Sequence, residues 1–175
     1  MTPSPPPENV KQSERDDALA VVRRLRTDAA SGDGTGDAQL DVIAAGRAPG
    51  DFAVLDTDGQ PLTRADLRGE VLVGFFSTLC RACVEALPGF VATAGAFPGG
   101  RDRVVAVVEG DQPQADRLAA RLAGAARVVV EEPDGAMGVA FQVAAYPAWC
   151  LLRDGTVRDS GTGTGSLRLP GAARA

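Results

Sequence analysis

Histidine is absent from the 175-residue sequence, and this absence removes several chemistries at once. A Ser-His-Asp hydrolase, a Cys-His protease and a zinc or haem site built on imidazole all lose their central residue. A zinc site built on thiolates alone needs one ligand more than the three cysteines supply. We therefore expect no metal site and no cofactor, apart from a redox centre that the cysteines themselves form.

Basic charge and long apolar runs are also scarce. The chain has 18 Lys and Arg against 23 Asp and Glu, a net charge of −5, without a long basic cluster, so we expect no nucleic-acid partner. No stretch approaches the roughly 20 apolar residues of a membrane span, and the N-terminus lacks the apolar core of a signal peptide. From these absences we expect no membrane association and a cytoplasmic location.

Composition predicts three regions along the chain. Residues 1–46 contain a proline-rich start that we predict to be disordered, a short amphipathic helix over 16–27 and a flexible tether over 31–46. Residues 47–160 carry the apolar patterns of one compact domain. Residues 161–175 are rich in glycine and are predicted to be a flexible tail.

Strand and helix patterns alternate within 47–160, which predicts an α/β sheet with helices on both faces. A hairpin over 52–62 opens the domain and is followed by a helical turn capped by Thr63. The near-continuous apolar run over 70–76 predicts a central strand buried on both faces. The remaining patterns predict helices over 80–95, 114–122 and 136–141 and strands over 104–108, 127–130, 149–152 and 156–158.

Two of the three cysteines form the motif Cys80-Arg81-Ala82-Cys83, which follows the central strand and opens a helix. Residues three apart on a first helical turn bring their sulfur atoms within reach of a disulfide. The unpaired amides at the helix N-terminus and the nearby Arg81 both stabilise a thiolate at Cys80. We predict that Cys80 attacks a substrate disulfide and that Cys83 resolves the mixed disulfide. The alternative is that both are small buried apolar side chains.

With this motif the chain resembles the thioredoxin superfamily, and within it the TlpA-like and MauD-like thiol-disulfide oxidoreductases. The resemblance extends over residues 47–159 and implies a thioredoxin-like fold with an N-terminal β-hairpin, a central αβ insertion over 114–130 and, in this chain, a degenerate C-terminal helix. Besides the cysteine pair, it depends on Gly50-Asp51-Phe52, Asp58-Gly59, Leu67-Arg68-Gly69, the strand Val71 to Ser77, Leu87-Pro88, and Phe141 to Pro147 followed by Leu151 to Gly155.

The resemblance implies further site residues. Pro147 is expected to form a cis peptide with Tyr146 beside the cysteine pair, and both residues are expected to contact the substrate. The alternative is an ordinary trans proline before a strand. Apart from the resemblance, we also expect Arg81, between the two cysteines, to contact the substrate. Gly74 and Ala86 stand where related proteins have a buried aspartate and a glutamate, so both acids are missing. The family is usually extracytoplasmic or membrane-anchored, unlike the location expected above.

The sequence thus predicts a thiol-disulfide oxidoreductase that reduces protein disulfides. Its partners would be protein or small-molecule disulfides and thiols, together with a dithiol electron donor. A peroxiredoxin-like peroxide reductase is one alternative, although Ser77 and Val73 stand where that chemistry uses threonine and proline. A non-catalytic thioredoxin-like binding module is the other. Cys150 lies on an apolar strand, and we predict that it is buried and inert rather than a third redox thiol.

Overall fold

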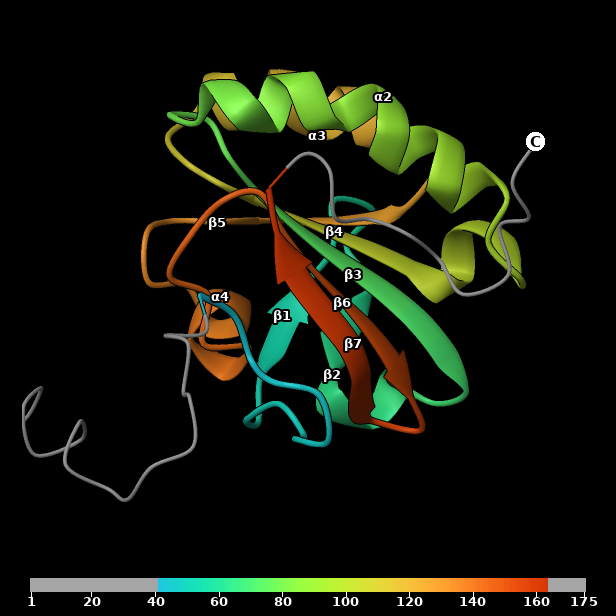
Figure 1. Cartoon of the computed structure of the whole chain (residues 1–175). Helices are drawn as coiled ribbons and strands as arrows, with labels where there is room; N and C mark the ends of the chain where they lie inside the picture. Colours follow the sequence, from blue (N-terminus) through green and yellow to red (C-terminus); the bar gives the residue numbers. More distant parts are fainter. Residues whose placement is uncertain (1–40, 164–175) are drawn as a thin grey trace, which may run out of the picture. The chain divides into compact units, whose positions relative to one another are not determined.

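The computed structural model describes residues 41–163, and its centre is a five-stranded sheet in the order β5-β4-β3-β6-β7 (Figure 1). Strand β3 pairs in parallel with β4 and antiparallel with β6, while β5 and β7 form the two edges. The strands are β3 (Glu70–Ser77), β4 (Val104–Glu109), β5 (Arg127–Glu131), β6 (Ala148–Arg153) and β7 (Thr156–Thr162). The predicted α/β architecture is therefore confirmed.

The apolar run of β3 explains why this strand is central. Its side chains alternate between two hydrophobic clusters: Val71, Val73 and Phe75 pack on one face of the sheet. On the other face Leu72 and Phe76 pack beneath the helices. A strand whose two faces are both apolar is stable only between two covering layers. The end of β3 is therefore held firmly, and the cysteine motif follows directly from it.

Helices cover one face of the sheet, and a smaller layer covers the other (Figure 1). The first layer is α2 (Arg81–Gly95) and α3 (Gln114–Leu122), and the second contains α4 (Ala136–Ala140) with the hairpin of β1 (Ala53–Leu55) and β2 (Pro61–Thr63). Short 3-10 helices span Arg64–Asp66 and Gly100–Arg103. None of the helices within residues 41–163 is both long and apolar enough to cross a membrane.

Two predicted boundaries need correction. Residues 41–46, predicted as part of a tether, are packed: Val42 and Ile43 are 4% and 2% exposed, and the Ile43 amide donates to the Phe141 carbonyl at 2.9 Å. Strand β7 runs to Thr162 rather than ending at 158, so the predicted tail begins inside it. The predicted helix over 16–27, and most of the tail with the degenerate closing helix, lie outside the described residues.

Candidate functional site

Cys80 is the N-cap of α2, reached through a short turn after β3. Its backbone is extended, with φ −103° and ψ 108°, and its sulfur accepts a hydrogen bond from the Cys83 amide at 3.2 Å. The first amides of a helix lack partners within the helix, so they face the group at the cap. The Cys80 sulfur therefore occupies the position at which a helix best stabilises a negative charge.

Cys83 lies one turn further into α2 and is fully buried. Burial, followed by the hydrogen bond with Cys80, raises the pKa of the Cys83 thiol to about 12. The Ser77 amide donates to the Cys83 sulfur at 3.4 Å, an interaction that acts in the opposite direction by favouring the thiolate. At neutral pH Cys83 is a protonated, enclosed thiol, whereas Cys80 is partly exposed.

The loop before β6 meets Cys80 from the opposite side. The Tyr146–Pro147 peptide bond is cis, as the resemblance implied. The Cys80 thiol donates to the Tyr146 carbonyl oxygen at 3.4 Å, and Pro147 is buried. The structure thus brings Cys80, Cys83, Tyr146 and Pro147 together from two distant segments of the chain.

Arg81 lies apart from these residues. Its side chain is 92% exposed, and its guanidinium pairs with the Glu85 carboxylate at 3.3 Å along the outer face of α2. A pair between such exposed groups contributes little to stability. Arg81 is therefore free to leave Glu85 for an incoming partner, and its contact with substrate stays a prediction.

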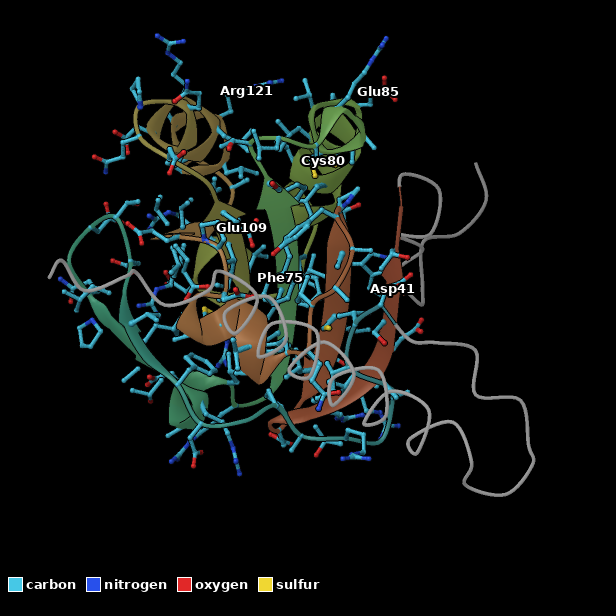
Figure 2. All side chains as sticks on the ribbon, turned by 90° about the vertical axis from the view of Figure 1, so that its left-hand side faces the viewer. Asp41, Phe75, Cys80, Glu85, Glu109 and Arg121 are labelled. Carbon is cyan, nitrogen blue, oxygen red and sulfur yellow. The ribbon has the colours of Figure 1, made fainter. Side chains whose placement is uncertain are left out.

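Glu109 is a site residue that the sequence did not reveal. It ends β4 opposite Ser77, and its carboxylate accepts a hydrogen bond from the Tyr146 hydroxyl at 2.5 Å. Burial and then this hydrogen bond raise the pKa of Tyr146, and the charge of Glu109 also contributes to the raised pKa of Cys83. Figure 2 shows Cys80 and Glu109 at the same end of the sheet. The only sequence signal is a carboxylate at the end of an apolar strand.

The position of the missing aspartate is filled by an aromatic ring. A Cβ atom at Gly74 would lie 2.4 Å from a ring carbon of Phe90 and 3.0 Å from one of Phe76. The rings of Phe76 and Phe90 pack edge to face with centroids 4.9 Å apart. Gly74 is therefore required by the packing of α2 on β3, and an acid at this position would need a rearranged core.

The remaining cysteine is isolated from this site. Cys150 lies on β6 in the hydrophobic cluster beneath the sheet and is fully buried, as predicted. Burial raises the pKa of its thiol to about 12. An enclosed, protonated thiol is a poor nucleophile.

Leu79, next to Cys80, is 95% exposed, so an apolar side chain lies in solvent beside the reactive residue.

No family model matches the chain, and no curated protein matches it in sequence. A solved structure from Neisseria meningitidis, assigned as a thioredoxin, is 25% identical, with a TM-score of 0.54 over 68% of this chain and 81% of that one. A Chlorobium tepidum protein assigned as the thiol:disulfide interchange protein DsbE is also 25% identical, with a TM-score of 0.51 over 69% and 86%. A secreted disulfide oxidoreductase of Mycobacterium tuberculosis is 19% identical, with a TM-score of 0.52 over 64% and 86%.

These structures share with this chain the mixed sheet covered by helices. They cover about two thirds of the chain, which is close to the extent of the described residues, and more than four fifths of their own length is matched. Together with the cysteine pair at the start of α2, they identify the architecture. The chain has the thioredoxin-like fold and belongs to the thioredoxin superfamily.

Proposed function

We propose that this protein is a thiol-disulfide oxidoreductase that reduces protein disulfides through Cys80 and Cys83. The observation that carries the proposal is the position of the Cys80 sulfur. It sits at the cap of α2, 3.2 Å from the Cys83 amide and 3.4 Å from the Tyr146 carbonyl oxygen. Helix amides stabilise the thiolate, and the loop of Tyr146 and Pro147 lies on the other side of the sulfur, where it would contact a bound substrate.

In the first step the Cys80 thiolate attacks one sulfur of the substrate disulfide. A bond forms between the two sulfurs while the substrate S–S bond breaks, and the expelled substrate thiolate takes a proton from water. The product is a mixed disulfide between Cys80 and the substrate. Cys80 takes this role because Cys83 is buried and protonated at neutral pH.

In the second step Cys83 loses its proton and attacks the Cys80 sulfur, which releases the substrate as a second thiol. The Ser77 amide, 3.4 Å from the Cys83 sulfur, stabilises the thiolate that must form. Two electrons pass from the chain to the substrate, which leaves the chain oxidised with a disulfide between Cys80 and Cys83. A dithiol donor returns the pair to the reduced state by the reverse exchange.

Equilibration of the protein in a graded series of dithiol and glutathione buffers tests this proposal. Free thiols are trapped and counted by mass. We expect a single two-electron transition in the wild-type chain and none in the Cys80→Ser and Cys83→Ser variants. A midpoint near roughly −270 mV would support reduction, and one near roughly −120 mV would indicate an oxidant instead.

Failure to form a Cys80–Cys83 disulfide anywhere in the series would refute the mechanism and favour the binding-module alternative. A parallel assay distinguishes the two functions directly, because reduction of a protein disulfide requires Cys80 whereas partner binding does not. The cytoplasmic location expected from the sequence stays a prediction.

A further inference from the structure

A groove lies between α2 and α3, beside the turn that carries Cys80. Its volume is about 200 Å³. Val84 of α2 forms one wall, and Arg117, Leu118 and Arg121 of α3 form the other. Ser77, which ends β3, and Thr78, in the turn that follows, close the end nearest the cysteines. Val84 follows Cys80 by about one helical turn, so the groove lies close to the reactive residue, although Cys80 does not itself line it.

The groove combines exposed apolar surface with positive charge. Val84 is 50% exposed, and Leu79 on the neighbouring turn is 95% exposed. Arg117 and Arg121 are spaced i, i+4 on α3, both are exposed, and neither forms an ion pair within residues 41–163. Figure 2 shows Arg121 on the α3 side of Cys80 and Glu85 on the α2 side.

This positive charge stands out in a chain whose net charge is −5. The arginines elsewhere that hold carboxylates, such as Arg127 with Asp56 and Arg101 with Asp58, are part of the fold itself. Acidic side chains also lie near the groove. Glu85 pairs with Arg81, Asp116 accepts from the Gln112 amide at 3.4 Å, and Glu109, opposite Ser77, accepts from the Tyr146 hydroxyl. Asp111 precedes α3 and is exposed. The guanidinium groups of Arg117 and Arg121 are therefore available to bind a group of another molecule.

We infer that the groove binds an acidic segment of the disulfide-bearing polypeptide, with carboxylates on Arg117 and Arg121 and an apolar side chain against Val84. The inference rests on the proposed function, since it names the class of substrate that Cys80 reduces. Guanidinium groups bind carboxylates in a planar, bidentate manner. Complementary charge next to the reactive sulfur also accelerates encounter with the correct partner.

The test uses the full chain in its reduced form and two symmetrical disulfide-linked peptides that differ only in Glu or Gln beside the cysteine. Second-order rate constants for peptide reduction are measured in single-turnover reactions. We expect the Glu peptide to react about tenfold faster at low salt, and we expect this preference to shrink as salt is raised to physiological strength and beyond.

Matched variants locate the preference. The double variant Arg117→Gln, Arg121→Gln should lose it, and Arg117→Glu, Arg121→Glu should reverse it in favour of a lysine-bearing peptide. Arg158→Gln, which removes an exposed charge on β7 at the far edge of the sheet, should retain it. All the substituted side chains are exposed, so we expect the fold to persist.

The outcomes separate the two proposals. Equal rates for the two peptides, or a preference that survives in the Arg117 and Arg121 variants, would overturn the inference that the groove binds an acidic segment. The oxidoreductase proposal would remain intact. A preference lost equally in Arg158→Gln would also overturn it, because the effect would then belong to the overall charge. If neither peptide is reduced while Cys80 still reacts with iodoacetamide, the proposed function itself fails.

Discussion

Tyr146 contacts both sides of the redox site, one through its backbone carbonyl and the other through its side-chain hydroxyl. Its carbonyl oxygen accepts from the Cys80 thiol, and its hydroxyl donates to Glu109 at the end of β4. The hydrogen bond at the hydroxyl therefore fixes the loop whose backbone faces the reactive sulfur. The charge of Glu109 acts separately, as one of the causes of the raised pKa of Cys83. Positioning and charge can thus be separated by substitution.

We predict that Tyr146→Phe lowers the free energy of unfolding by about 1 to 2 kcal/mol, since the partly buried Glu109 carboxylate loses its partner. Glu109→Gln should lower the free energy of unfolding by less, because the amide oxygen of the glutamine still accepts a hydrogen bond from the Tyr146 hydroxyl. Glu109→Gln should in addition move the titration of Cys83 to lower pH, whereas Tyr146→Phe retains that charge and should not.

Denaturant unfolding measures the first effect. The second is measured by the pH dependence of Cys83 modification with a small neutral thiol reagent, in a Cys80→Ser, Cys150→Ala background. If both variants leave the Cys83 titration where it is, the charge of Glu109 has no part in the site. The Glu109–Tyr146 pair would then be only a structural contact.

The sequence contains enough information to find the thiols but not the carboxylate beside them. The spacing of Cys80 and Cys83, and the helix start between them, are local features that a sequence displays directly. Glu109 lies 37 residues from Tyr146, and their contact exists only because β4 pairs with β3 in one register. Gly74 was recognised as a departure, but the ring of Phe90 that fills its place depends on how α2 packs.

At the scale of elements, a buried carboxylate is one of the groups that hold the N-terminal hairpin to the sheet, beside the Thr57 amide, which donates to the Val128 carbonyl of β5. Asp56, in the turn between β1 and β2, accepts from the amides of Asp58 at 3.0 Å and Gln60 at 2.8 Å, and from the Arg127 guanidinium of β5 at 2.9 Å. Burial alone would raise the pKa of Asp56, but these hydrogen bonds and the charge of Arg127 hold it below 3.8.

We predict that Asp56→Asn lowers the free energy of unfolding by about 3 kcal/mol, because Arg127 loses its charged partner at a largely buried site. A carboxyl whose pKa is depressed in the fold stabilises it above the unfolded pKa and loses this contribution as pH falls through the folded value. The variant should therefore show a flatter decline in stability below about pH 4 than the wild-type chain.

Asp58→Asn, in the same turn, is the matched control, since the ion pair of Asp58 with Arg101 is exposed and should contribute less than about 1 kcal/mol. Urea unfolding across the acidic range measures both variants. An equal loss in Asp56→Asn and Asp58→Asn would mean that burial of Asp56 adds nothing to its contribution.

Elements with a regular period were predictable, and the segment without one was not. Helix α3 spans the predicted residues 114–122 because its buried side chains recur at helical spacing. Residues 41–46 carry one short apolar pair in a glycine-rich surrounding. Their burial comes from distant partners: the Gly46 amide donates to the Val157 carbonyl, and the Ser160 hydroxyl donates to the Ile43 carbonyl.

At the scale of the whole molecule, three weakly acidic groups have raised pKa values: the buried thiols of Cys83 and Cys150 and the half-buried hydroxyl of Tyr146. Burial is the first cause of the raised pKa in each case. The pKa values of the Cys83 and Cys150 thiols rise from 9.0 to about 12. The pKa of the Tyr146 hydroxyl rises above its ordinary value of 10.0. Two of the groups lie in opposite layers, with Cys83 above the sheet and Cys150 beneath it.

These groups predict an alkaline limit to stability. As pH rises above the unfolded pKa values, the unfolded chain loses protons that the folded chain still holds. Stability is therefore full below about pH 9 and declines until the folded values are reached near pH 12. Each buried thiol should contribute a slope of about 1.4 kcal/mol per pH unit within this window.

Unfolding by urea under reducing conditions, from neutral to strongly alkaline pH, measures the slope. Cys150→Ala lowers stability at every pH because it leaves a small cavity, but its slope should be shallower by one proton, since one titrating thiol is gone. The slope rather than the absolute stability is therefore the test. A slope in Cys150→Ala equal to that of the wild-type chain would mean that the Cys150 thiol ionises equally readily in the folded and unfolded states, and that its layer of the core admits water.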